Sequence, residues 1–256
     1  MTRTDHLLIT CEHGGNRIPP RYRPLFAGFE AILRTHRGYD AGALAVARQM
    51  ARLLDAPLFV STTSRLLIDL NRSISHPNLY SEATRGAPAD VRHDILDTHY
   101  LPYRERVEAH IAGAIANGSR VIHLSSHSFT PVLDGSVRNA DVGLLYDPAR
   151  SGELELCRQW QARIKDRAPG LKVRRNYPYA GSSDGLTAYL RRRFPADVYV
   201  GIELEINQKH VIHGGRQWRM VQDQVIEALR QAMTEQASDP DKLASQVPAR
   251  KPSVAR

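Results

Sequence analysis

Short apolar runs, typical of buried strands, alternate along this chain with segments of helical periodicity. The central run covers residues 121–124, and the clearest amphipathic helix covers residues 41–54. Because alternating strands and helices place helices on both faces of a sheet, they limit the possible architectures to a few. The sequence therefore predicts an α/β fold, a three-layer αβα sandwich around a mainly parallel or mixed central sheet.

Turn residues and caps set the boundaries of these elements. Gly118 is the stop signal of a long helix that bends near Pro102. Residues 73–90, rich in Pro, Ser and Gly, read as a long loop that is either functional or disordered. Helices are predicted over residues 29–34, 41–54, 90–117, 152–168, 186–194 and 216–236, and strands over 7–10, 57–61, 65–72, 121–124, 141–146, 198–207 and from 173 onward.

The length of 256 residues suits one large domain with a full core, which we place at residues 1–236. Residues 237–256 are polar and contain Pro, so we expect a disordered tail. No apolar run approaches the roughly 20 residues that span a bilayer, and the N-terminus leads into a strand rather than an apolar signal segment. We therefore expect a cytoplasmic protein without a membrane partner.

The sequence has 35 Lys and Arg against 27 Asp and Glu, a formal net charge of +8. A basic surface could attract nucleic acid, but no nucleic-acid-binding motif accompanies it. We assign the excess to a solvated surface and to arginines that bind an anionic small molecule, and expect no nucleic-acid partner. The two cysteines are too few for a disulfide framework. Cys11 lies beside His13 but is more typical of a small buried residue than of a nucleophile.

Three predicted strands carry side chains that can bind a metal or transfer protons. Glu12 and His13 follow the first strand, His127 follows the central one, and Glu203 and Glu205 lie on the last. Ligands of α/β proteins collect where strands end, and a catalytic zinc uses three His or carboxylate ligands, with a fourth position left for water. A single histidine is more often structural, but two near carboxylates predict a metal hydrolase.

Four sequence blocks carry a family resemblance: CEHGGN at residues 11–16, SRLLIDLNR at 64–72, HSFTP at 127–131 and NYPYAG at 176–181. Taken together and in order, they resemble the N-formylglutamate amidohydrolase family, from about residue 7 to about residue 230. That family in turn resembles the zinc carboxypeptidases and the aspartoacylase/succinylglutamate desuccinylase group. The resemblance implies a zinc-carboxypeptidase-like (phosphorylase/hydrolase-like) fold and zinc as the cofactor.

The relatives bind zinc through a His, a Glu three residues later and a distant His on a central strand. The resemblance assigns the two histidines to His13 and His127. The residue three after His13 is Asn16, and an amide is a poor zinc ligand. The carboxylate ligand must therefore come from elsewhere in the chain.

In the relatives, the zinc-binding Glu opens a helix that packs on the sheet. The equivalent helix here opens at Asp40, after an inserted loop. We therefore predict that Asp40 supplies the carboxylate, with Glu12 and His36 as competitors. A plain helix N-cap is an equally weighted interpretation of Asp40.

Glu203 and Glu205 lie two apart on a strand and so share one face. Two carboxylates on one buried face repel unless one is protonated or paired, which predicts a shifted pKa. The resemblance places the general base in a block like residues 204–207, which selects Glu205. This base would take a proton from the attacking water and pass it to the leaving amine. Glu203 would pair with an arginine or support a ligand.

Arg65, Asn71 and Arg72 resemble the residues that polarise the scissile carbonyl and hold the substrate carboxylate in the relatives. A guanidinium binds carboxylates through two hydrogen bonds, and positive charge stabilises a developing oxyanion. Arg65 is therefore the catalytic candidate, and Asn71 and Arg72 are candidates for substrate binding. Further substrate-binding candidates are Arg138, Arg174, Asn176, Tyr177 and Tyr179.

The resemblance implies a zinc-dependent amidohydrolase of histidine degradation that cleaves an N-acyl amino acid, N-formyl-L-glutamate, to formate and L-glutamate. Two alternatives stay open. One is a zinc carboxypeptidase or amidase that acts on a peptide or cell-wall fragment. The other is a basic binding protein without catalysis. Neither the oligomeric state nor the metal bound follows from the sequence.

Overall fold

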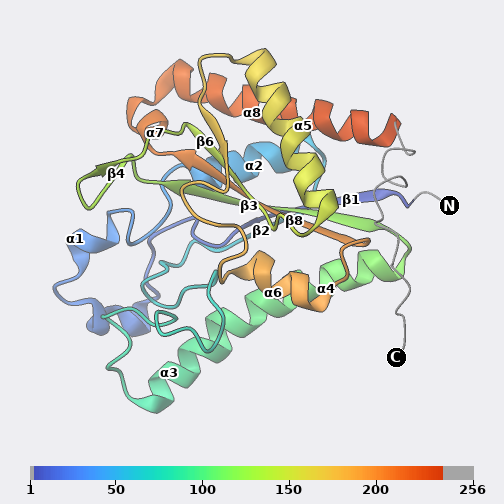
Figure 1. The fold of residues 1–256 in the computed structure, drawn as a ribbon. Helices are drawn as coiled ribbons and strands as arrows, with labels where there is room; N and C mark the ends of the chain where they lie inside the picture. The colour runs from blue at the N-terminus through green and yellow to red at the C-terminus, as the bar shows by residue number, and fades with distance from the viewer. Residues whose placement is uncertain (1–2, 239–256) are drawn as a thin grey trace, which may run out of the picture.

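The computed structural model, which describes residues 3–238, contains a sheet of six strands in the order β2-β1-β3-β8-β6-β7 (Figure 1). β2, β1, β3 and β8 run parallel, whereas β6 runs antiparallel to β8 and parallel to β7. The predicted α/β fold with a mixed sheet is confirmed. The strands are β1 (Asp5–Cys11), β2 (Leu58–Val60), β3 (Arg120–Phe129), β6 (Val142–Leu145), β7 (Val173–Arg175) and β8 (Tyr199–Asn207).

Helices cover both faces of this sheet (Figure 1). One layer consists of α2 (Ala43–Leu53), α5 (Ser151–Arg167) and α8 (Gly215–Ser238), and the other contains α4 (Leu101–Ala116) and α6 (Leu186–Arg193). Each layer buries its own apolar cluster, with Trp160 in the first and Tyr199 in the second. Because β3 and β8 are covered on both sides, polar side chains on them need partners inside the protein.

The predicted helix over residues 90–117 is confirmed as three consecutive segments, α3 (Ala89–Ile95), η2 (Leu96–Tyr100) and α4. The middle segment is a π-helical turn, in which the N–H of Leu101 bonds the carbonyl of Leu96. Pro102, the second residue of α4, offers no N–H, so the wider turn before it relieves the crowding that proline imposes on a helix. Gly118, at φ +83°, follows the end of the helix.

The smaller elements lie at the ends of the sheet and on its rim. The hairpin of β4 (Val132–Leu133) and β5 (Ser136–Val137) follows β3 directly, and α7 (Lys209–His213) follows β8. The others, η1 (Pro20–Phe26) and α1 (Glu30–Leu33), belong to the long connection between β1 and α2.

The predicted strand at residues 65–72 is wrong. Leu67 is fully buried, but the segment forms turns and pairs with no strand of the described chain. Its backbone bonds to the following loop instead, from the N–H of Asp69 to the carbonyl of Leu79. Hydrophobic content alone does not separate a buried strand from another buried segment. The loop at residues 73–90 is ordered and packs around this segment.

The interpretation of Asp40 as the N-cap of α2 is also wrong. No side chain caps this helix, and Gly42, in the left-handed region at φ +83°, precedes its first residue. A Cβ on Gly42 would lie 2.5 Å from the side chain of Val211, so glycine allows both the turn and the close packing of α7. The carboxylate of Asp40 is thus directed elsewhere.

The remaining predicted helices and strands are confirmed to within a few residues. Among the described residues, no helix combines the length and apolar character that crossing a bilayer requires. The predicted tail at residues 237–256 lies almost wholly outside the described residues.

Candidate active site

A cavity of about 360 Å³ lies at the end of the sheet where β1, β3 and β8 finish. These neighbouring strands run parallel, so their carboxyl ends meet at one edge, and the register places His127 beside Glu205. The cavity therefore combines side chains from the ends of all three strands for which the sequence predicted site residues. Its lining includes His13, His36, Asp40, Arg65, Asn71, Arg72, His127, Phe129, Tyr179, Asp184, Glu203 and Glu205.

His13, Asp40 and His127 converge on one point of this cavity. Nδ1 of His127 lies 2.9 Å from Oδ2 of Asp40, and Nδ1 of His13 lies 3.5 Å from the same oxygen. All three residues are buried, and one ligand atom from each lies within 4.8 Å of the others. In the described chain, no other cluster of three His, Cys, Asp or Glu could hold a metal ion. Two imidazoles and a carboxylate form a ligand set suited to a divalent metal.

His13 is held from behind by a carboxylate. Its Nε2 donates to Oδ1 of Asp69 at 2.7 Å, and Arg65 donates to the other oxygen of Asp69 at 2.7 Å. Although burial opposes ionisation, Arg65 and His13 hold the pKa of Asp69 well below its usual value. The buried Nδ1 of His13 has no hydrogen-bond partner. Because an unpartnered buried polar atom costs stability, Nδ1 is suited to accept a ligand.

His127 is held in the same way on the other side. Its Nε2 lies 3.1 Å from Oε2 of Glu12 and 2.9 Å from Oγ of Ser125. Tyr103 donates to the second oxygen of Glu12 at 2.8 Å. Although burial opposes ionisation, His127 and Ser125 hold the pKa of Glu12 far below its usual value. Each histidine therefore has a carboxylate on its far nitrogen, the arrangement that orients imidazole ligands of metals.

Ser125, His127 and Asp40 also form a chain that superficially resembles a serine-hydrolase triad. The direction of the hydrogen bonds is opposite to that in a triad. Ser125 donates its proton to Glu12 at 2.5 Å and accepts a hydrogen bond from His127. Ser125 is fully buried and does not line the cavity. A nucleophile must donate to its base and reach the substrate, so this serine has a structural role.

The groups around the cluster carry an excess of negative charge. Despite burial, the two imidazoles hold the pKa of Asp40 far below its usual value, so that Asp40, Asp69 and Glu12 are all carboxylates. Arg65 contacts two of them and contributes one permanent positive charge. Burial opposes protonation of His127, but hydrogen bonds to Asp40 and Glu12 raise its pKa well above the usual value. This electrostatic environment favours additional positive charge at the centre of the cluster.

Glu205 reaches the cavity from β8, beside His127. Burial raises its pKa to about 8, and the charges of Asp40 and Glu203 reinforce the shift. Its buried Oε2 has no hydrogen-bond partner. Glu203, the other member of the pair, accepts a hydrogen bond from Thr187 at 2.6 Å rather than from the expected arginine. A carboxyl group that titrates near neutral pH suits a general base.

Comparison with known proteins now identifies the family. The chain matches the family model of N-formylglutamate amidohydrolase over residues 5–212. It belongs to the N-formylglutamate amidohydrolase family. The family resemblance predicted from the four sequence blocks is confirmed, and family membership makes this chain a hydrolytic enzyme, an amidohydrolase.

Solved structures agree with this family in fold. A gene product of Agrobacterium tumefaciens is 30% identical, with 90% of each chain covered and a TM-score of 0.77. The N-formylglutamate amidohydrolase of Ralstonia eutropha JMP134 is 18% identical, with 93% of this chain and 96% of that chain covered, and a TM-score of 0.66. The search of curated proteins gave no match.

Arg72 and Asn71 line the cavity of this amidohydrolase, as a substrate-binding role requires. Arg72 donates from Nη1 to the carbonyl of Asp184 at 2.9 Å. The Oδ1 atom of Asn71 accepts the N–H of Leu186, the first residue of α6, at 2.6 Å, and Nδ2 lies 3.4 Å from Nε2 of His127. Asn71 is therefore anchored between α6 and the cluster of His13, Asp40 and His127, whereas Arg72 keeps further donors.

Arg65 lines the cavity but is strongly bound to the cluster. Its Nε and Nη2 donate to Asp69, and its Nη1 donates to Asp40 at 3.4 Å. These carboxylates raise the pKa of Arg65 against the effect of burial. Its positive charge thus lies beside the cluster of His13, Asp40 and His127.

The residues of the 176–181 block divide into two groups. Tyr179 lines the cavity and is 46% exposed. Asn176 and Tyr177 do not line it: Oδ1 of Asn176 accepts two backbone N–H groups, and the ring of Tyr177 packs edge-on against Phe129. Arg174 stacks on Tyr177 outside the cavity. These residues hold the loop that presents Tyr179.

The other candidates for the carboxylate ligand do not reach the point where His13, Asp40 and His127 converge. Glu12 is behind His127, and Asn16 does not line the cavity. His36 lines the cavity but is exposed, outside the buried group. Cys11 is buried, and burial raises the pKa of its thiol, which disfavours a reactive thiolate.

The sequence analysis missed the role of Asp69. A signal was present, because Asp69 interrupts the apolar run of residues 66–70, and a charge in such a run requires a partner. The interpretation of this run as a strand concealed the signal. In the folded chain, Asp69 links Arg65 to His13.

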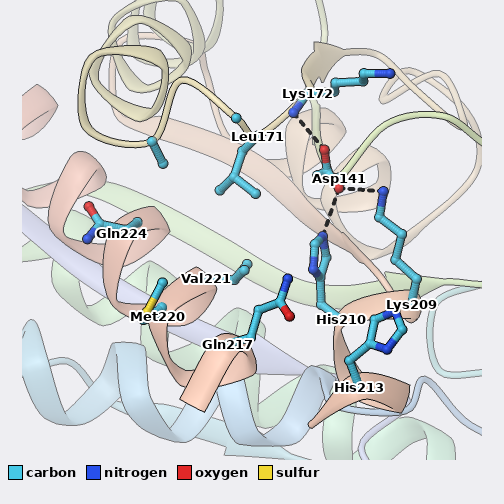
Figure 2. A pocket seen from close by; sticks show the side chains of 12 residues that line it. Asp141, Leu171, Lys172, Lys209, His210, His213, Gln217, Met220, Val221 and Gln224 are labelled. Carbon is cyan, nitrogen blue, oxygen red and sulfur yellow. Dashed lines mark hydrogen bonds and ion pairs between the residues drawn. The ribbon is translucent and has the colours of Figure 1, made fainter. Parts of the chain in front are cut away.

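A larger cavity, of about 570 Å³, lies away from this site between α8 and the connection from α5 to β7 (Figure 2). Asp141 lines this cavity and bonds to His210, Lys209 and the backbone N–H of Lys172. Apolar side chains such as Leu171 and Val221 form its walls. None of the proposed catalytic residues lines it.

Proposed function

We propose that this protein is a zinc-dependent amidohydrolase that deacylates an N-acyl amino acid, with N-formyl-L-glutamate as its substrate. The observation that carries this proposal is the convergence of His13, Asp40 and His127 on one point at the cavity. The family supplies the reaction class, and the small cavity fits an amino-acid derivative better than an extended peptide.

The residues present fit a zinc ion. Nδ1 of His13, Nδ1 of His127 and a carboxylate oxygen of Asp40 would hold it, with Asp69 and Glu12 as the supporting carboxylates. The unpartnered, buried Nδ1 of His13 is the specific sign of this fit. Bound zinc supplies a Lewis acid that polarises the acyl carbonyl and acidifies water.

Glu205 serves as the general base in this proposal. It takes a proton from the water that attacks the formyl carbon, and it returns a proton to the nitrogen as the C–N bond breaks. The products are formate and L-glutamate. The charge of Arg65 stabilises the negative oxygen that develops on the formyl carbon, and Arg72 and Asn71 hold and orient a carboxylate of the substrate. Tyr179 covers the substrate from the rim.

Metal analysis and formate release test this proposal together. We expect about one zinc per chain after reconstitution, chelator-sensitive release of formate from N-formyl-L-glutamate, and recovery of the activity when zinc is restored. Cleavage of longer peptides without any release of formate would contradict the substrate. A protein that binds no zinc in equilibrium dialysis would contradict the assignment of the ligands.

A further inference from the structure

Arg138 does not itself line the catalytic cavity, but it stacks on two residues that do, Phe129 and Tyr179. It follows β5, its backbone N–H donates to the carbonyl of Pro131 at 2.8 Å, and its carbonyl accepts from Asn207 at 3.1 Å. Asn207 is the last residue of β8, and Pro131 lies just beyond β3. The backbone of Arg138 is thus anchored to the two strands that carry His127 and Glu205.

The guanidinium of Arg138 is held by two aromatic rings of the cavity lining. Its central carbon lies 5.1 Å from the ring centre of Tyr179 and 6.0 Å from that of Phe129, and Nη1 donates to the Tyr179 hydroxyl at 3.0 Å. Stacking over aromatic faces orients a guanidinium without using its hydrogen-bond donors. Within residues 3–238, no carboxylate pairs with Arg138, so most of its donors are available to a ligand.

Arg65, which contacts the cluster directly, differs from Arg138 because its guanidinium is paired with carboxylates. Arg65 directs all three of its guanidinium nitrogens to Asp69 and Asp40. The guanidinium of Arg72 makes a single hydrogen bond, to the carbonyl oxygen of Asp184. Two guanidinium groups near the cavity therefore have unused donors: Arg72 in the lining, and Arg138 stacked on Phe129 and Tyr179 of the lining.

We propose that Arg138 is a specificity-determining residue that binds the side-chain carboxylate of a dicarboxylic N-acyl amino acid, while Arg72 holds the α-carboxylate. This inference rests on the proposed function and assigns the residue that selects the amino acid. A guanidinium binds a carboxylate through charge-assisted hydrogen bonds, which a neutral amide cannot replace in full. The site would thus prefer N-formyl-L-glutamate to N-formyl-L-glutamine.

Paired substrates and a charge-removing variant test this inference. With zinc-loaded enzyme, we expect kcat/KM for N-formyl-L-glutamate to exceed that for N-formyl-L-glutamine by roughly 10- to 100-fold, the range of a charge-assisted hydrogen bond. Arg138→Gln should lose most of this preference by a fall on the glutamate substrate, with less than about threefold change on the glutamine substrate.

Two variants separate direct binding from indirect effects. Arg174→Gln removes a neighbouring guanidinium that stacks on Tyr177 outside the cavity, and it should leave the preference unchanged. Tyr179→Phe removes the hydroxyl to which Arg138 donates, yet keeps the ring beneath the guanidinium. Tyr179→Phe should retain most of the preference for N-formyl-L-glutamate. If this variant lost the preference, Arg138 would act only through Tyr179, and the inference would be overturned.

Calorimetric titration of the zinc-loaded protein with each N-formyl amino acid distinguishes the failure of this inference from that of the proposed function. Turnover without a preference, or a preference that survives in Arg138→Gln, overturns the inference while the function stands. Absence of turnover, with preferred binding of N-formyl-L-glutamate that Arg138→Gln abolishes, supports the inference and rejects the function. Absence of both turnover and preferential binding rejects both.

Discussion

Two cavities of this protein each contain a buried aspartate bonded to histidine, but only the smaller of these two combines His13, Asp40 and His127. In the larger, Asp141 is satisfied by His210, by the ammonium of Lys209 at 2.6 Å and by a backbone N–H (Figure 2). Although burial opposes ionisation, these partners hold the pKa of Asp141 far below its usual value. The cluster is a closed ion pair that stabilises the fold.

In the smaller cavity, hydrogen bonding is left incomplete around one point. Nδ1 of His13 and Oε2 of Glu205 are buried and unpartnered, and both lie in the same cavity as Asp40. His210 also has one unpartnered nitrogen, but its carboxylate is already satisfied and no second imidazole joins Asp141. Cavity volume alone would select the larger cavity as the candidate active site. Unsatisfied polar atoms that converge on one point are the better sign of a functional site.

The largest expected effect comes from deleting one imidazole in each cavity. His127→Ala should lose bound zinc and lower kcat/KM for formyl hydrolysis by at least about 10³-fold, because three protein ligands hold a catalytic zinc. His210→Ala should keep one zinc per chain and an activity within about threefold of wild type. Elemental analysis and formate release measure both variants. Zinc loss in His210→Ala, or zinc retention in His127→Ala, would remove the distinction between the two cavities.

The next effect concerns proton transfer. Glu205→Gln should lower kcat by about 10²- to 10⁴-fold, the usual contribution of a general base, with zinc content unchanged. Asp141→Asn, the equally buried carboxylate of the larger cavity, should lower thermal stability and leave kcat nearly unchanged. Steady-state kinetics together with thermal unfolding check this contrast. If Glu203→Gln proved far more damaging than Glu205→Gln, the roles of the two glutamates would have to be exchanged.

A smaller effect is expected from the carboxylates behind the imidazoles. Glu12→Gln and Asp69→Asn should each weaken zinc binding by about 10- to 100-fold, because these groups orient the ligands and raise their basicity. Competition with a zinc-binding dye gives the dissociation constants. Asp141→Asn is the matched control and should leave zinc affinity unaltered. Unchanged affinity in both Glu12→Gln and Asp69→Asn would show that the supporting carboxylates are dispensable.

The smallest effect concerns a buried histidine without a carboxylate partner. His123 lies between Thr10 and Tyr199, and burial lowers its pKa from 6.5 to about 4. The unfolded chain then binds a proton at a higher pH than the folded chain, so stability falls as the pH drops below about 6.5. From pH 7.5 to 5.5, this group should remove on the order of 1 kcal/mol from the free energy of unfolding.

Denaturant unfolding at the two pH values, in wild type and His123→Gln, isolates this contribution. The variant should lack that part of the pH dependence, whatever its stability at pH 7.5. An identical pH dependence in both proteins would show that folding does not lower the pKa of His123. His127 provides the contrast on the same strand, because Asp40 and Glu12 raise its pKa despite burial.

The sequence by itself determined most of the architecture. Apolar runs and helical periodicity located the strands of the sheet and the main helices, because burial in a covered sheet demands continuous apolar runs. The same patterns placed His13, His127 and Glu205 near strand ends. They failed at residues 65–72, where a buried apolar segment forms turns instead of pairing with a strand.

Only the tertiary structure decided how the site is assembled. Asp40 lies 87 residues from His127 and Asp69 lies 56 residues from His13, and their contacts depend on loops whose paths no local pattern encodes. The sequence offered Asp40 both as a helix cap and as a ligand. Long-range packing around Gly42 excludes the helix cap, and the loop that carries Asp40 directs its carboxylate toward His13 and His127. Periodicity reports what a segment must bury, whereas the convergence of distant side chains depends on how those segments pack together.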